Sequence, residues 1–314
     1  MLETHESLER PTAAQGDTSA TDFRTEREFT VNERSRARMA FRLFLRHRVA
    51  AASVVVFVLL CAFAFIGPLV WHYSYTFETE DLSVGPSAKH PFGTDSLGVD
   101  GMATVMRGTA QSLKVAFIIG ILGTGAGALW GVIAGYLGGF TDSALMRLAD
   151  LILTIPALAL AAALARAGGG SLWQIGVILA AVSAPYVARV VRGVVLSLRE
   201  REFIEAARAL GASNLRIMFR HLMPNTLPVL IVNATLLIAA GILAETALSY
   251  VGFGIQSPDT SLGVLITQAQ GAVDTRPWLF YFPGLFIILI ALTVNFIGDG
   301  LRDALDPRQT RERR

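Results

Sequence analysis

The segment from 205 to 224 is the part of this chain whose residue types and spacing most clearly indicate a function. It reads Glu-Ala-Ala-Arg-Ala-Leu-Gly-Ala-Ser-Asn-Leu-Arg-Ile-Met-Phe-Arg-His-Leu-Met-Pro, between two long apolar runs. Such a segment is an amphipathic helix that presents charges beside small residues, where another backbone can approach closely. A segment of this kind is suited to binding a soluble partner protein rather than to catalysing a reaction. The alternative is a solvated loop with no partner.

Glu205 and Arg208 fall within one helical turn, so they share a side of this helix. Gly211 should bend or break it, which favours two short helices over one rod. Pro224 is expected to end the segment and start the next apolar run. The residues predicted to meet the partner are Glu205, Ala206, Ala207, Arg208, Gly211, Ala212 and Pro224.

No set of residues predicts catalysis. The sequence has no GxxxxGK(S/T) phosphate loop, no His-Glu-x-x-His zinc helix and no Gly-x-Ser-x-Gly elbow. Cys61 is the only cysteine, which excludes an internal disulfide and a thiolate metal site. We therefore expect no catalytic residue, no metal and no cofactor bound by this chain.

Composition indicates a membrane protein. The 314 residues are 53% hydrophobic and 17% charged, with a mean hydropathy of +0.50, against about 25% charged residues in soluble domains. A membrane-spanning helix needs about 20 apolar residues. Six runs approach or exceed that length: 49–71, 112–136, 145–166, 173–195, 226–248 and 279–299. The predicted fold is an all-α polytopic membrane protein.

The arginines predict its orientation. They cluster before the first run, in the loop 196–225 and in the C-terminal tail, whereas the loop 72–111 holds only Lys89 and Arg107 against five acids. By the positive-inside rule, both termini and the 196–225 loop lie in the cytoplasm. Because the arginines flank apolar runs, binding to nucleic acid is disfavoured. The N-terminus does not resemble a cleavable signal peptide, so the first run is expected to remain as an anchor.

Outside the spans, the sequence divides into a few segments. Residues 1–32 lack apolar periodicity and are predicted to be a disordered cytoplasmic tail. Residues 33–48 place arginines at four-residue spacing, which predicts an interfacial helix or a simple stop-transfer flank. After the extracytoplasmic loop 72–111, residues 112–310 are predicted to form the core, followed by a tail at 311–314.

Glycine and proline predict how the spans pack. A stripe of four glycines at four-residue spacing predicts close helix contact, with a flexible gate as the alternative. Two prolines within spans, Pro156 and Pro185, are expected to kink or break their helices. The glycines of the stripe are Gly123, Gly127, Gly131 and Gly135.

Polar side chains inside apolar runs are candidates for a translocation path, because a membrane tolerates them only with partners. Asn233 and Glu245 both fall in the run 226–248. Either of two arrangements fits them: they line a polar path, or they form hydrogen bonds with neighbouring helices.

Many short motifs, in order from about residue 36 to 310, resemble one family. They are His90-Pro91-Phe92-Gly93-Thr94-Asp95, Ala134-Gly135-Tyr136, Glu205-Ala206-Ala207, His221-Leu222-Met223-Pro224-Asn225, Leu243-Ala244-Glu245, Phe282-Pro283-Gly284 and Gly298-Asp299-Gly300-Leu301-Arg302-Asp303. The chain resembles the second, C-type permease subunit of the ABC importers for dipeptides, oligopeptides or nickel. It departs from the family at Val99 and near Ala110, where an arginine is common, which leaves substrate contacts there in doubt.

The resemblance implies a type I ABC importer permease fold in the inner membrane, with cytoplasmic coupling helices in the EAA loop (196–225). It implies three kinds of protein partner: a second homologous permease subunit, two ATP-binding subunits that use the ATP, and an extracytoplasmic substrate-binding protein. It also implies that the chain is embedded in the lipid membrane. It implies transport of short peptides or, in some relatives, nickel complexes. The alternatives are an ion-coupled secondary transporter or channel that works alone, supported by Glu245 and the prolines, and an intramembrane enzyme, disfavoured by the absent catalytic set.

Overall fold

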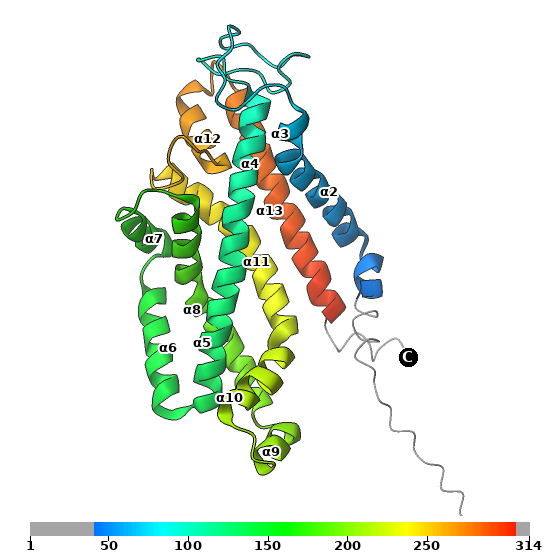
Figure 1. The fold of residues 1–314 in the computed structure, drawn as a ribbon, viewed down its shortest axis with the longest axis vertical. Helices are drawn as coiled ribbons and strands as arrows, with labels where there is room; N and C mark the ends of the chain where they lie inside the picture. The colour runs from blue at the N-terminus through cyan, green and yellow to red at the C-terminus, as the bar shows by residue number, and fades with distance from the viewer. Residues whose placement is uncertain (1–40, 306–314) are drawn as a thin grey trace, which may run out of the picture.

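A computed structural model describes residues 41–305, which form a bundle of helices without a β-sheet. The helices run mostly along one long axis, with α9 and α10 at one end and an irregular loop at the other (Figure 1). The first half comprises α2 (Arg48–Phe65), α3 (Gly67–Val70), α4 (Gly101–Ile118), the π-helical turn η1 (Ile119–Gly123), α5 (Thr124–Leu137), α6 (Gly139–Thr154) and α7 (Ala157–Ala165). The second half comprises α8 (Leu172–Leu198), α9 (Glu202–Ala209), α10 (Asn214–Arg216), η2 (Ile217–Leu222), α11 (Met223–Tyr250), α12 (Leu262–Ala269), η3 (Gln270–Ala272) and α13 (Trp278–Leu305).

Within residues 41–305, five helical segments are long and apolar enough to cross a membrane. A sixth is counted if the bent pair α6 and α7 forms one broken span, with an angle of 89° between its halves. Pro156 lies at this break, as predicted, because it cannot donate the backbone hydrogen bond that would continue α6. The all-α, polytopic fold expected from the sequence is confirmed.

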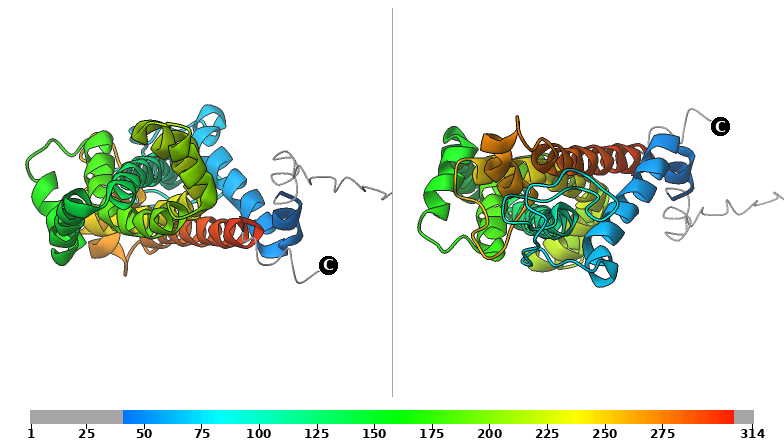
Figure 2. Two further views of the ribbon diagram at one scale, coloured as in Figure 1. Left: turned by 90° about the horizontal axis from the view of Figure 1, so that it is seen from below. Right: turned by 90° about the horizontal axis from the view of Figure 1, so that it is seen from above.

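The end views show an elongated cross-section (Figure 2). The green helices α6 and α7 lie at one end of it, and the red α13 and blue α2 lie at the other. Helices α4 and α11 lie between them and contact both halves. The described bundle is therefore elongated in cross-section, with α4 and α11 between its two ends.

The predicted glycine stripe is the contact between α5 and α8. A Cβ atom added at Gly127 would lie 2.6 Å from the Ala184 carbonyl oxygen, and one at Gly131 would lie 2.5 Å from that of Ala188. Real Cβ atoms do not approach backbone oxygens so closely, so only glycine permits this helix separation. Packing is thus the role of the stripe in this structure.

Two features of the helices differ from the sequence prediction. Helix α4 begins at Gly101 rather than 112, because the Asp100 side chain accepts a hydrogen bond from Ala103 N and caps it. Helix α8 continues through Pro185, so of the expected kink or break the break is wrong, and a kink stays a prediction. The predicted tail 1–32, much of the interfacial helix 33–48 and the tail 311–314 lie outside the described residues; residues 41–46 are helical.

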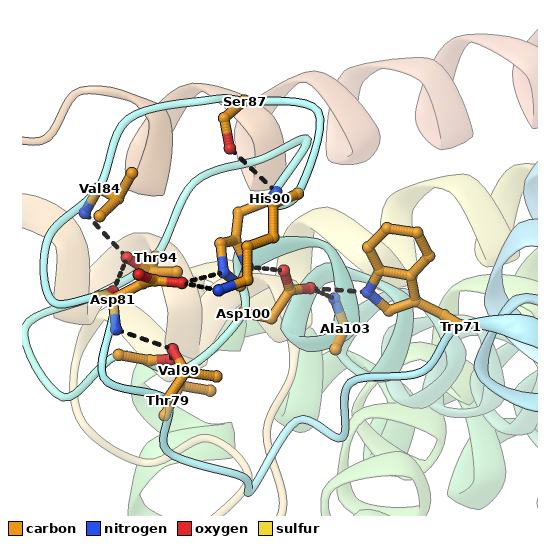
Figure 3. A network of polar contacts seen from close by, with 12 residues as sticks. Trp71, Thr79, Asp81, Val84, Ser87, His90, Thr94, Val99, Asp100 and Ala103 are labelled. Carbon is orange, nitrogen blue, oxygen red and sulfur yellow. Dashed lines mark hydrogen bonds and ion pairs between the residues drawn. The ribbon is translucent and has the colours of Figure 1, made fainter.

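A hydrogen-bond network holds the loop between α3 and α4 (Figure 3). His90 is buried, with Nδ1 2.8 Å from Asp100 Oδ2 and Nε2 3.2 Å from Asp81 Oδ2. Trp71 Nε1 donates to Asp100 Oδ1 at 3.0 Å, and Lys89 Nζ donates to Asp81. The network ties the loop to the first turn of α4 through Asp100.

This network predicts a stability that is lost in acid. Hydrogen bonds from Lys89 and then His90 lower the pKa of Asp81. Because the folded carboxylate holds its proton more weakly, the network stabilises the fold above the ordinary Asp pKa of about 4 and loses that contribution as the pH falls below it. We expect Asp81→Asn to lower the thermal midpoint at pH 7 but to match the wild type in acid below the lowered pKa.

The neighbouring exposed acid provides the control for this measurement. Glu80→Gln removes a carboxylate from the same loop that makes no side-chain hydrogen bond in the described structure and acts on the network only through its charge near Lys89, so its melting curve should lie much closer to that of the wild type than the Asp81→Asn curve does at pH 7. If the difference in thermal midpoint between the wild type and Asp81→Asn stays the same in acid, the ionised Asp81 carboxylate is not the source of the stability.

Candidate coupling site

The segment 205–224 is broken at Gly211, as the sequence predicted, into the short helix α9 and a second part, α10 and η2, that continues directly into α11. Helix α9 ends at Ala209, and Gly211 follows with φ +78°, a left-handed conformation that glycine adopts without strain. Ser213 then caps α10 by accepting a hydrogen bond from Arg216 N. Helix α10, η2 and α11 follow one another without a gap from Asn214 to Tyr250, so Pro224 lies inside a continuous helical segment and the expected end of the segment at this residue is wrong.

The inner face of the segment packs on the membrane helices. Ile204 and Ala207 of α9 belong to one buried cluster with Ile217 and Leu222 of η2, and Ala212 packs against it. The cluster continues into α5 and α8 through Tyr136, Val187, Val191 and Val195. A movement of α9 would therefore be transmitted to α5 and α8 through the closely packed side chains of this cluster.

Tyr136, at the cytoplasm-facing end of α5 in the predicted orientation, joins both short helices. Its hydroxyl donates to Asn214 Oδ1 at 3.0 Å, and the Arg208 guanidinium lies 5.4 Å from the centre of its ring. Next to it, Arg199 Nη1 donates to the Gly135 carbonyl oxygen at 3.1 Å. These contacts fix the angle between the coupling segment and α5.

The outer face of the segment is exposed and mixes charge with apolar surface. Glu205, Ala206 and Arg208 are exposed on α9, and Leu210 is 88% exposed at its end. No atom lies within 4 Å of a Cβ built on Gly211, so a partner surface has free access to this turn. An exposed leucine among charges at a helix end is the composition of a protein contact surface.

The structure brings together most of the predicted contact residues, but on two sides of α9. Glu205, Ala206 and Gly211 lie on the exposed side, whereas Ala207 is buried in the cluster with Ile204. Leu210 and Tyr136 were not among the contact residues predicted from the sequence. The motif Ala134-Gly135-Tyr136 could have drawn attention to Tyr136. The exposure of Leu210 could not be predicted, because it depends on the end of α9 at Ala209.

The two path candidates are both buried. Glu245 is fully enclosed and accepts hydrogen bonds from Ser112 on α4, Ser249 on α11 and Ser261 at the start of α12. Asn233 donates to the Val229 carbonyl oxygen of its own helix at 2.8 Å. The bonds from Ser112 and Ser261 link Glu245 to α4 and α12, which is the hydrogen-bonding alternative considered from the sequence. A role in lining a path stays a prediction for both Glu245 and Asn233.

Among the described residues, no group of three or more His, Cys, Asp or Glu side chains is placed to hold a metal ion. The expectation that the chain binds no cofactor stays an expectation.

Comparison with known proteins covers most of the chain. Residues 127–311 match the family described as "Binding-protein-dependent transport system inner membrane component", and residues 35–86 match the "N-terminal TM domain of oligopeptide transport permease C". The chain is 41% identical over 283 residues to the oligopeptide transport system permease protein OppC of Mycobacterium tuberculosis, covering 89% of this chain and 97% of that protein. It is 39% identical over 276 residues to the dipeptide transport system permease protein DppC of Alkalihalophilus pseudofirmus, covering 86% and 90%.

A solved structure supports the fold. A chain of the MetNI methionine ABC transporter, in an inward-facing conformation, superposes with a TM-score of 0.52 at 23% identity. The match covers 65% of this chain and 97% of that one. The helix arrangement is thus the one found in an ABC importer permease.

Proposed function

The chain belongs to the family of binding-protein-dependent transport system inner membrane components, and on that premise we propose that it is the C-type permease subunit of an ATP-driven peptide importer. The chain is a multi-pass inner-membrane protein by its family and its apolar helices. Short peptides are the proposed substrates, because relatives that match along almost their whole length are named for oligopeptides and dipeptides.

In this proposal, the chain pairs with a second, homologous permease to enclose the path. Two ATP-binding subunits hold the α9 segments of the two permeases, and an extracytoplasmic binding protein delivers the peptide. Closure of the ATP-binding subunits moves α9, and the movement passes through the buried cluster to α5 and α8, switching the pair between two states. Both termini and the 196–225 loop lie in the cytoplasm, as the arginine distribution indicates.

The observation that carries this proposal is the two-sided structure of the segment 205–224. One side is exposed and includes Glu205 and Leu210, while the other packs against Tyr136 and α8. A segment that only closed a loop would not need an exposed apolar contact surface continuous with the packing of the spans.

The direct test is to purify the tagged chain from its native membrane in mild detergent and identify what accompanies it. We expect an ATPase, a second permease and a binding protein. Recovery of the chain alone, with uptake in vesicles that needs an ion gradient and no ATP, would instead favour a secondary transporter.

A finer prediction concerns uncoupling. Glu205→Ala removes an exposed charge, so the protein should insert and fold normally while the ATP-driven uptake falls roughly tenfold, the value of a charge-assisted contact. Gly211→Asp should have a larger effect, because it strains a backbone with φ +78° and adds a charge to the contact surface. ATPase activity and peptide uptake, measured together in vesicles, report the loss of coupling.

Gly252→Asp is the matched control for strain. Gly252 has φ +90° and no atom within 4 Å of an added Cβ, like Gly211, but lies in the loop after α11 at the other end of that helix. Normal uptake by Gly211→Asp at normal expression, or equal loss of coupling in both glycine variants, would remove the support for docking at α9.

A further inference from the structure

A cavity of about 420 Å³ lies between the α2–α3 turn, the chain that follows it and the first turns of α4. Its polar lining differs from that of the two other cavities near the same end of the bundle. Arg107 and Lys114 both line it, and no acidic residue does. Asp95 lines each of the other two, and Asp259 lines one of them. The charged residues that line the cavity are therefore both cations, which favours an anionic ligand.

The two cations are not equivalent. Arg107 is neutralised by Asp259, which accepts from its Nε at 2.9 Å and its Nη2 at 3.0 Å. Lys114 has no carboxylate within ion-pair distance in the described part of the chain; its Nζ donates only to Gln111 Oε1, at 3.1 Å. The ammonium lies 5.9 Å from the centre of the Phe65 ring. Lys114 is exposed on the surface of the described chain, so a counter-charge for it has to come from outside the chain.

The position of the cavity corresponds to a membrane interface. Helix α2 has 18 residues, about 27 Å of helix, and so covers most of the ~30 Å hydrocarbon core. The cavity lies at the Phe65 end of α2, where three aromatic residues with polar atoms, Trp71, Tyr73 and Tyr75, line it. Tryptophan and tyrosine concentrate at headgroup depth. Lys114 is therefore placed at the level of lipid phosphates.

Next to the cavity, the α2–α3 turn presents apolar surface outward. Leu69 is 83% exposed and Val70 is 81% exposed, and Ile66 is exposed beside them. An acyl chain alongside this turn would cover these side chains while its headgroup lies in the cavity. This continuity of an apolar strip with a cationic, aromatic cavity matches the two parts of a phospholipid.

We propose that this cavity binds an anionic phospholipid, with Lys114 contacting the phosphate and the chains lying along the Ile66, Leu69 and Val70 surface. The bound lipid supplies the counter-charge that Lys114 lacks and fills the space between α2 and α4. Basic pockets between membrane helices are the sites where anionic headgroups bind.

The test uses the full-length chain, with any subunits that accompany it, titrated with phosphatidylglycerol or phosphatidylcholine in detergent and followed by native mass spectrometry. We expect one phosphatidylglycerol to bind in preference to phosphatidylcholine. Lys114→Gln should weaken phosphatidylglycerol binding roughly tenfold, the loss of a charge-assisted contact, and abolish the preference. Lys114→Arg should keep most of the phosphatidylglycerol affinity and the preference over phosphatidylcholine, because arginine also contacts phosphate.

Arg276→Gln is the matched control, because Arg276 is another cation near this end of the bundle that lines a different cavity. Its lipid binding should equal that of the wild type. The variant Leu69→Gln with Val70→Gln changes only exposed positions, so it should fold and should weaken the binding of both lipids. This second variant tests the site even if the lysine variants are unstable.

Equal phosphatidylglycerol binding by wild type and Lys114→Gln would overturn the proposal. The same anion chemistry also fits the terminal carboxylate of a peptide. If Lys114→Gln leaves lipid binding unchanged but removes a difference in uptake between free and C-terminally amidated peptides, the ligand is that carboxylate and the lipid assignment is wrong.

Discussion

Gly131→Ala is expected to destabilise the folded chain, although it adds only one methyl group. The new Cβ would lie 2.5 Å from the Ala188 carbonyl oxygen and 2.8 Å from Val191 Cβ, both held within α8. Backbone atoms of a helix cannot move aside singly, so α5 and α8 must separate along their whole contact. We expect a loss of about 1–3 kcal/mol of folding free energy, with the lost close contacts adding to the strain.

Gly125→Ala separates this effect from helix propensity. Gly125 lies on the same helix with no atom within 4 Å of an added Cβ, and alanine favours helix over glycine by about 1 kcal/mol. Its thermal midpoint in detergent should therefore equal or exceed that of the wild type, while that of Gly131→Ala falls. Uptake should follow the same order. Equal midpoints for the two variants would show that the α5–α8 contact is looser than the structure has it.

The features that the sequence predicted correctly are those encoded by local composition. Apolar length predicts the spans, the four-residue glycine spacing predicts a close helix contact, and Gly211 predicts the turn between α9 and α10. Pro156 breaks its span, whereas Pro185 does not break α8. Pro156 is exposed at its break and Pro185 is buried within α8, a difference in burial that the local sequence pattern does not contain.

The contacts between distant segments could not be predicted in this way. The Tyr136 hydroxyl meets Asn214 across 78 residues, and Arg107 meets Asp259 across 152. Hydrogen bonds of that range depend on which helices are neighbours, and apolar periodicity does not specify neighbours. Glu245 shows the same limit, because its burial by Ser112 and Ser261 appears only when α4 and α12 are brought beside α11.

Leu210→Asp is expected to abolish binding of the ATP-binding subunits while leaving the chain folded. Leu210 is 88% exposed, so the fold gains little from it. Covered by a partner, a leucine side chain contributes roughly 1.5–3 kcal/mol. Aspartate in its place loses that burial and introduces an unpaired charge that costs several kcal/mol more to bury. The affinity should therefore fall by at least about 100-fold, whereas Leu210→Ala should lose roughly tenfold.

The affinity is measured with the purified ATP-binding subunits and the chain in nanodiscs, beside Leu97→Asp as the control. Leu97 is also an exposed leucine, at the opposite end of the bundle, so its replacement adds the same charge away from the proposed contact. If Leu210→Asp binds the ATP-binding subunits like Leu97→Asp, the exposed side of α9 is not the docking surface. A graded loss, from alanine to aspartate at position 210 with none at 97, would locate the contact at the turn where α9 ends. Because the opposite side of α9 packs on Tyr136 and α8, the same contact would then be the point where force enters the spans.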